Sequence, residues 1–157
     1  MTDKQSGILI VGIGNPDRGD DAAGRAAVAR LKALGPKNLR VIESDGEATG
    51  LLARFSEADE VILIDAVLSG AAPGTVGRFD VNEAPLPTGR FGISTHGFGL
   101  AEAIELARTL GCLPRRCVVY AIEGRSFTLG ERLSPEVETA VEGVIESILN
   151  TISLTAG

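Results

Sequence analysis

The strongest constraint on the fold of this chain is that its most apolar segments are continuous rather than alternating. Residues 7–13, 60–66 and 116–123 each contain a run in which neighbouring positions are Ile, Leu, Val or another apolar residue. A strand with one face in water alternates polar and apolar residues, whereas a continuous run is typical of a parallel strand that is covered on both faces. These segments therefore predict strands of a parallel sheet.

The segments between these runs have the patterns of helices and of two more strands. An aspartate cap at Asp20 or Asp21 and apolar residues at helical spacing predict a helix that ends near Leu34. Further helices are predicted at residues 48–55, at residues 96–110 and from Ser134-Pro135 to about Ile152. Strands are predicted at residues 39–43 and at residues 74–80, where the alternating pattern indicates an edge strand.

Strands and helices alternate along the chain, and this order predicts the fold class. We expect an α/β protein: a three-layer sandwich with a mainly parallel twisted sheet flanked by helices, and one edge strand that runs antiparallel. The sequence has no linker, internal repeat or low-complexity segment. Residues 1–157 are therefore expected to form a single domain.

The charge of the chain excludes two classes of partner. It has 15 Lys and Arg against 21 Asp and Glu, with a net charge of -6. Nucleic acid and anionic lipid both require a basic surface, so neither is an expected partner. The apolar run after the polar segment 1–7 is too short for a signal peptide or a membrane span. We therefore expect a cytoplasmic protein.

The two cysteines do not form a recognisable motif. Cys112 and Cys117 are separated by Leu-Pro-Arg-Arg, a spacing that fits neither a redox CxxC nor a paired zinc knuckle. Free cysteine is among the most frequently buried residue types. We expect two reduced thiols, of which one or both are buried.

The loop after the first apolar run, which begins Gly12-Ile13-Gly14-Asn15, invites comparison with the dinucleotide fingerprint. That fingerprint requires another glycine three residues after the second one, and Asp17 stands there. The aspartates of the loop would also repel a pyrophosphate. Asp45 follows the second strand, where a ribose-binding carboxylate would lie, but we predict no nucleotide cofactor and a tight strand-to-helix turn.

Two acids and the only histidine occupy corresponding places in the predicted topology. Asp21 follows the first strand, Asp65 ends the third, and His96 precedes a helix. Each alone has a structural explanation, as a helix cap or a polar strand end. Right-handed crossovers place all three at the carboxyl edge of the sheet, where open α/β sheets bind ligands. Two carboxylates and one imidazole can hold a divalent transition metal with open coordination positions.

Hydrolases with a side-chain nucleophile fit the sequence less well. No GxSxG motif is present, and Ser94 and Thr95 are too close to His96 in sequence to face it without special geometry. Cys117 could pair with this histidine only if its strand passed the site. A resident catalytic zinc is also not expected, because the chain has no HExxH motif and no second histidine.

The motifs resemble those of the hydrogenase maturation proteases, the nickel-dependent processing endopeptidases of the NiFe hydrogenases. The resemblance covers nearly the whole chain. It is carried by the following motifs: Gly12-x-Gly14-Asn15, Asp20-Asp21-x-x-Gly24, Asp65-Ala66, Ser94-Thr95-His96 and Gly130-x-x-Leu133-Ser134-Pro135-Glu136-Val137. The first metal ligand is Glu in many members of this family and Asp in others, and Ala22 here replaces the usual glycine after the acidic pair.

The resemblance implies an activity and the residues that perform it. Members of the family remove a C-terminal extension from the hydrogenase large-subunit precursor after nickel insertion. The family's catalytic and metal-binding positions correspond to Asp21, Asp65 and His96. The nickel belongs to the precursor, and the free enzyme is expected to bind it weakly or not at all. Metal polarisation of the scissile carbonyl, or a carboxylate base such as Asp21 or Asp65, can activate the attacking water.

We expect the glycine-rich loops to bind the precursor peptide, with contacts from Gly14, Asn15, Asp20 and Gly97. Two alternatives come from other functional classes. The opening Gly12-Ile13-Gly14-Asn15-Pro16 is similar to that of peptidyl-tRNA hydrolases, but their Arg-His-Asn segment is absent and this chain is acidic. A non-catalytic accessory protein of the same fold would bind metal or peptide without cleavage.

Overall fold

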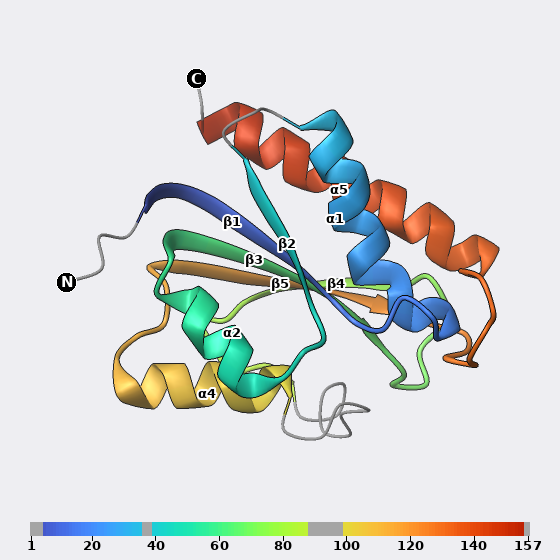
Figure 1. Cartoon of the computed structure of the whole chain (residues 1–157), viewed down its shortest axis with the longest axis horizontal. Helices are drawn as coiled ribbons and strands as arrows, with labels where there is room; N and C mark the ends of the chain where they lie inside the picture. The colour runs from blue at the N-terminus through green and yellow to red at the C-terminus, as the bar shows by residue number, and fades with distance from the viewer. Residues whose placement is uncertain (1–4, 36–38, 88–98, 156–157) are drawn as a thin grey trace.

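The computed structural model describes residues 5–35, 39–87 and 99–155, and within them the chain forms a five-stranded sheet with helices on both faces (Figure 1). The strands are β1 (Gln5–Ile13), β2 (Arg40–Ser44), β3 (Ala58–Val67), β4 (Val76–Asp80) and β5 (Arg116–Glu123). The helices are the 3-10 helix η1 (Gly19–Ala22), α1 (Ala23–Leu34), α2 (Ala48–Phe55), α4 (Leu100–Leu110) and α5 (Pro135–Thr155).

The sheet has the order β2-β1-β3-β5-β4. The pairs β1·β2, β1·β3 and β3·β5 are parallel, and β4 pairs with β5 in the antiparallel direction at one edge. The predicted α/β class, the mainly parallel sheet and the antiparallel edge strand are therefore confirmed. The three continuous apolar runs lie in the three inner strands, β1, β3 and β5.

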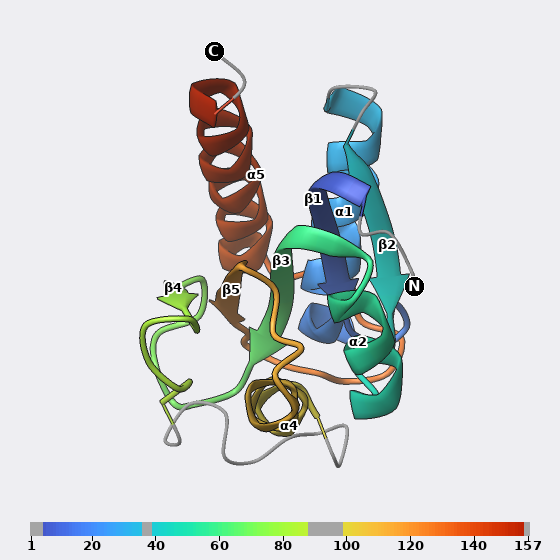
Figure 2. The ribbon, with the colours of Figure 1, turned by 90° about the vertical axis from the view of Figure 1, so that its left-hand side faces the viewer.

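Helices cover the two faces of the sheet in pairs, and this explains why the runs do not alternate. Figure 2 shows α1 and α5 on one side of the sheet and α2 and α4 on the other. Along β1, Leu9 and Val11 belong to the apolar cluster under α2 and α4, whereas Ile10 belongs to the cluster under α1 and α5. Successive side chains of a strand point to opposite faces, so both faces of an inner strand must be apolar here.

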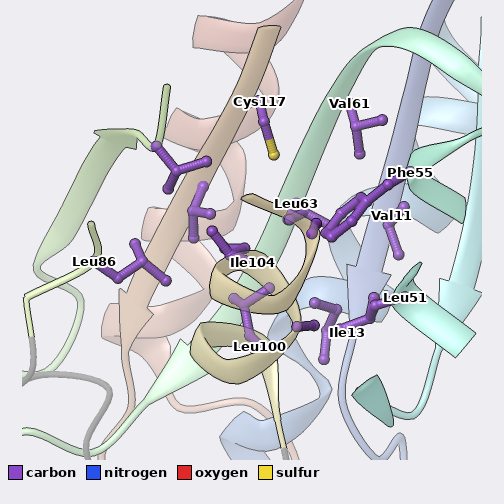
Figure 3. Packing of buried hydrophobic residues seen from close by; sticks show 14 of the residues in the cluster. Val11, Ile13, Leu51, Phe55, Val61, Leu63, Leu86, Leu100, Ile104 and Cys117 are labelled. Carbon is purple, nitrogen blue, oxygen red and sulfur yellow. The ribbon is translucent and has the colours of Figure 1, made fainter. Parts of the chain in front are cut away.

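The cluster under α2 and α4 extends from one edge of the sheet to the other (Figure 3). Leu100, in the first turn of α4, lies at the same end of this cluster as Ile13, the last residue of β1. Cys117 and Val61 lie at the opposite end of the cluster. The N-terminus of α4 therefore lies near the carboxyl end of β1. No helix among the described residues is long and apolar enough to cross a membrane.

Helix α1 approaches the sheet so closely that backbone touches backbone. A Cβ atom added at Gly24 would lie 2.3 Å from the carbonyl oxygen of Ile64 and 2.6 Å from that of Ile13. On the strand side, a Cβ atom at Gly12 would lie 2.3 Å from the carbonyl oxygen of Gly24. Only glycine permits this contact, which places the start of α1 directly over the ends of β1 and β3.

Two predicted helix starts are wrong. The N-cap residue of α1 is Ala22, with no side-chain capping hydrogen bond, because the carboxylates of Asp20 and Asp21 accept hydrogen bonds elsewhere. The helix predicted to begin at His96 begins at Leu100. Its N-cap Gly99 is not helical, and the Glu102 side chain accepts the backbone N–H of Gly99.

We expect Gly24→Ala to lower the free energy of unfolding by about 1–3 kcal/mol, because the new methyl group would collide with two strand carbonyls. Urea denaturation followed by circular dichroism measures the change. Gly143→Ala is the matched control, since a Cβ atom at this helical position of α5 meets nothing within 4 Å. It should raise stability by about 0.5–1 kcal/mol. Equal stability of the two variants would contradict the close packing of α1.

Candidate active site at the carboxyl edge of the sheet

Asp21 and Asp65 lie at the carboxyl edge of neighbouring strands, as the topology predicted. The last paired residues of β1 and β3 are Gly12 and Ile64, and Asp65 follows directly. Asp21 lies in η1, which begins six residues after the end of β1. Asp21 is 0% exposed and Asp65 is 7% exposed. The edge therefore contains two buried carboxylates, a concentration of negative charge that favours a divalent cation.

The loop that follows β1 surrounds Asp21. Its Oδ2 atom accepts the backbone N–H of Asn15 at 3.2 Å. Gly14 has a positive φ of 139°, and a Cβ atom there would lie 1.9 Å from the carbonyl oxygen of Asp21. Gly14 and Asn15 thus both contact Asp21. Their predicted contact with a substrate peptide stays a prediction.

The side chain of Asp65 lies on the face of the sheet that α2 and α4 cover. Leu63 and Val67, two residues away on either side, both belong to the apolar cluster of that face. The Oδ1 atom of Asp65 accepts the backbone N–H of Ala66 at 2.9 Å. This hydrogen bond orients the carboxylate between Leu63 and Val67, its apolar neighbours on this face of the strand.

Asp20, next to Asp21, joins two distant loops. Its Oδ2 atom accepts the backbone N–H groups of Arg125 and Ser126 at 2.8 and 3.2 Å and the Ser134 hydroxyl at 2.9 Å. Its Oδ1 atom accepts the backbone N–H of Ser134 at 2.7 Å. The carboxylate is 1% exposed. These contacts give Asp20 a structural role, and none of them bears on its predicted contact with substrate.

An ion pair joins the segment between β5 and α5 to the start of α5. Arg125 donates to Glu136 in the first turn of α5. This hydrogen bond lowers the pKa of the exposed Glu136 carboxyl, and the same contact raises the pKa of Arg125. The segment is therefore fixed both to the loop of Asp21, through Asp20, and to α5.

His96 and Gly97 lie outside the described residues, so the predicted set of three metal ligands stays a prediction. Among the residues that the structure does describe, no group of three or more His, Cys, Asp or Glu side chains could hold a metal ion. Asp21 and Asp65 supply two carboxylates at one edge, which is the part of the predicted set that the described residues can test. Hard carboxylate oxygens suit a divalent metal when a softer nitrogen completes the set.

Two residues near this edge were not singled out in the sequence. Glu123 ends β5 and is 1% exposed, and its carboxylate accepts the backbone N–H and the hydroxyl of Ser69. Like Asp65, it is an acid at the end of an apolar strand, so the same signal could have found it. Arg25 donates from Nε to the carbonyl oxygen of Gly14 at 2.6 Å, a contact that no sequence pattern indicated.

The described cysteines do not belong to this edge. Cys117 pairs with Val61 near the amino end of β5, while Asp65 pairs with Ala121 four residues further along. Four residues of a strand span about 13 Å. Both cysteines are free; Cys117 is buried and Cys112 partly exposed, as predicted. Burial, with a smaller contribution from the Asp80 carboxylate, raises the pKa of the Cys117 thiol to about 12, and Arg108 opposes the shift.

Comparison with known proteins gives the family. A family model described as hydrogenase maturation protease matches residues 26–151. The chain belongs to the hydrogenase maturation protease family. It is 30% identical over 146 residues to the hydrogenase 2 maturation protease of Escherichia coli K12, across 90% of this chain and 88% of that protein.

Solved structures of hydrogenase maturation proteases have the same fold. The hydrogenase maturating endopeptidase HybD of Escherichia coli has a TM-score of 0.78 and 26% identity, over 94% of this chain and 93% of that one. The NiFe hydrogenase maturation protease HybD of Thermococcus kodakarensis has a TM-score of 0.70 and 30% identity, over 90% and 95% of the two chains. As a hydrogenase maturation protease, the chain is a hydrolase, and the peptidyl-tRNA hydrolase alternative is set aside.

We expect Asp20→Asn to lower the free energy of unfolding of this hydrogenase maturation protease by about 2 kcal/mol. Either orientation of the amide would place its NH₂ group against a backbone N–H that now donates to Asp20. The change is measured by urea denaturation. Asp17→Asn, in the same loop but exposed, is the control and should change stability by less than about 0.5 kcal/mol. A loss of activity with unchanged stability for Asp20→Asn would contradict the structural role.

We expect Cys117 to be unreactive in the folded enzyme. A thiol whose pKa is raised to about 12 carries almost no thiolate at neutral pH, and thiolate is the reactive form. Iodoacetamide at pH 7.5 should therefore label Cys112 alone in native protein and both cysteines in urea, as mass spectrometry of peptides would show. Rapid native labelling of Cys117 would contradict its burial.

Proposed function

We propose that this protein is the nickel-dependent endopeptidase that removes the C-terminal extension of a NiFe hydrogenase large-subunit precursor after nickel insertion. The single observation that carries the proposal is the pair of buried carboxylates, Asp21 and Asp65, at the carboxyl edge of β1 and β3. Family membership supports the reaction class. The similarity to a NiFe hydrogenase maturation protease supports the type of hydrogenase.

In this proposal the nickel ion is part of the substrate. Asp21 and Asp65 offer carboxylate oxygens, and His96 offers an imidazole nitrogen, to the metal that the precursor already carries. Three protein ligands leave coordination positions for the precursor's own ligands. A site of this kind binds free nickel weakly, so the enzyme recognises the loaded precursor rather than the empty one.

The residues around the carboxylates would then position the peptide. Gly14 packs directly against the backbone of Asp21, where a side chain would collide with the carbonyl oxygen of that residue. Arg25 holds the carbonyl oxygen of Gly14, and Asn15 donates its backbone N–H to Asp21. In this proposal the extended precursor peptide contacts the loop of Gly14 and Asn15, and Gly97 stays a predicted contact. Asp20 would contribute by holding the loop, not by touching the peptide.

Two groups would promote the attack of water on the scissile carbonyl. The precursor's nickel, held by Asp21, Asp65 and His96, would supply Lewis-acid polarisation of that carbonyl. Asp21 or Asp65 can accept the proton of the attacking water, since both are carboxylates held by backbone N–H groups.

The cytoplasmic location stays a prediction from the sequence.

We expect Asp21→Asn, Asp65→Asn and His96→Ala each to lower the rate of precursor processing by about 100-fold or more, because each removes a proposed ligand of the substrate's nickel. Purified protein is mixed with nickel-loaded precursor, and the mass of the large subunit is followed over time. Asp59→Asn, at the other end of the same strand as Asp65, is the matched control and should leave the rate unchanged.

Circular dichroism and thermal melting of each variant separate a lost ligand from a lost fold. A folded His96→Ala protein that trims loaded precursor at the wild-type rate would overturn the nickel-sensing role. Processing of nickel-free precursor by the wild type would overturn the dependence on nickel.

A further inference from the structure

Two leucines stand exposed on loops at the edge that carries Asp21 and Asp65. Leu68 directly follows β3, three residues after Asp65, and is 49% exposed. Leu129 lies in the segment between β5 and α5 and is 72% exposed. We call these two residues the leucine rim.

The backbone on both sides of Leu68 is held in place. Before it, the carbonyl oxygen of Val67 accepts the backbone N–H of Gly124 at 2.9 Å. After it, Ser69 donates its backbone N–H at 2.8 Å and its hydroxyl at 2.5 Å to the carboxylate of Glu123. The backbone that carries the exposed side chain of Leu68 is thus held on both sides.

The residue that anchors this loop is costly to bury. Glu123 is 1% exposed, and burying a carboxylate is unfavourable unless hydrogen bonds compensate for the lost water. Here Ser69 supplies the compensating hydrogen bonds, and the residue before it, Leu68, stays about half exposed to solvent. Exposure alone does not distinguish Leu68, because Leu34 and Leu110 are more exposed elsewhere on the surface. Its distinguishing feature is its place, on a held loop directly after the strand that carries Asp65.

Leu129 has the same relation to the other carboxylate. The next residue, Gly130, donates its backbone N–H to the carbonyl oxygen of Asp17 at 2.8 Å. Ser126 of the same segment accepts the backbone N–H of Asp20 at 2.9 Å. The loop of Leu129 is therefore fastened to the loop that carries Asp21. Leu68 therefore lies on the segment that follows Asp65, and Leu129 lies on a segment that is hydrogen-bonded to the loop of Asp21.

We propose that the leucine rim is a docking surface for apolar side chains of the hydrogenase precursor on either side of its nickel-bearing segment. This inference rests on the proposed function, because the occupant is the substrate of that site. Its support is the attachment of both leucines to the segments that carry Asp21 and Asp65. Contact with the rim would bind the folded precursor without taking part in the chemistry, so it should affect affinity and not turnover.

The test measures kcat and KM for processing of nickel-loaded precursor by the wild type and by Leu68→Ala, Leu129→Ala and Leu68→Asp. Each alanine variant should raise KM roughly tenfold, as expected for lost burial of several methyl groups, and leave kcat unchanged. Leu68→Asp should raise KM further. The matched control is Leu110→Ala, because Leu110 is 65% exposed but ends α4 before β5 begins, at the opposite edge of the sheet.

Several results would overturn the leucine rim. They are an unchanged KM in both alanine variants, an equal rise in KM for Leu110→Ala, or a fall in kcat alone. Failure of the proposed function gives a different result, since the wild type itself would then leave the precursor uncut. In that case the Kd of wild type and variants for the intact precursor, measured by biolayer interferometry, decides the matter: a tenfold rise for Leu68→Ala and Leu129→Ala alone supports the rim, and equal values reject it.

Discussion

The contact between Gly24 and the ends of β1 and β3 determines where Asp21 lies relative to Asp65. With no side chain at Gly12 or Gly24, α1 rests on the strand carbonyls themselves. The 3-10 turn that precedes α1 is therefore held against the carboxyl ends of two neighbouring strands. This brings Asp21, which belongs to a loop, to the same edge as Asp65, which belongs to a strand. A larger residue at either glycine would separate the two carboxylates.

Buried carboxylates have different tasks at this one edge. Asp20 and Glu123 accept hydrogen bonds from neighbouring loops and hold those loops in place. Asp21 and Asp65 also accept backbone N–H groups, but they lie beside the carboxyl ends of β1 and β3, where the sheet ends. This placement agrees with the proposed roles, in which Asp20 and Glu123 hold the loops and Asp21 and Asp65 bind the substrate's metal.

Much of the fold followed from the sequence because burial on both faces leaves a clear pattern. The runs in residues 7–13, 60–66 and 116–123 became the inner strands, and the alternating segment 74–80 became the antiparallel edge strand. The common edge of Asp21 and Asp65 followed from topology alone. The role of Asp20 did not, because a cap and a long-range acceptor look alike locally, and its donors lie at Arg125, Ser126 and Ser134. Glu123 showed the same signal as Asp65 and was passed over.

The hydrogen bonds of Asp20 also bear on when the enzyme becomes active during its own synthesis. They join residues that are 105 to 114 positions apart in the chain. Ribosomes make a chain from its N-terminus at about 5–20 residues per second, and contacts this distant form late in folding. Asp20, beside Asp21, therefore lacks its hydrogen bonds from Ser134 until that residue has left the ribosome. A fragment that ends before Ser134 therefore lacks the hydrogen bonds from Ser134 that hold the loop beside Asp21.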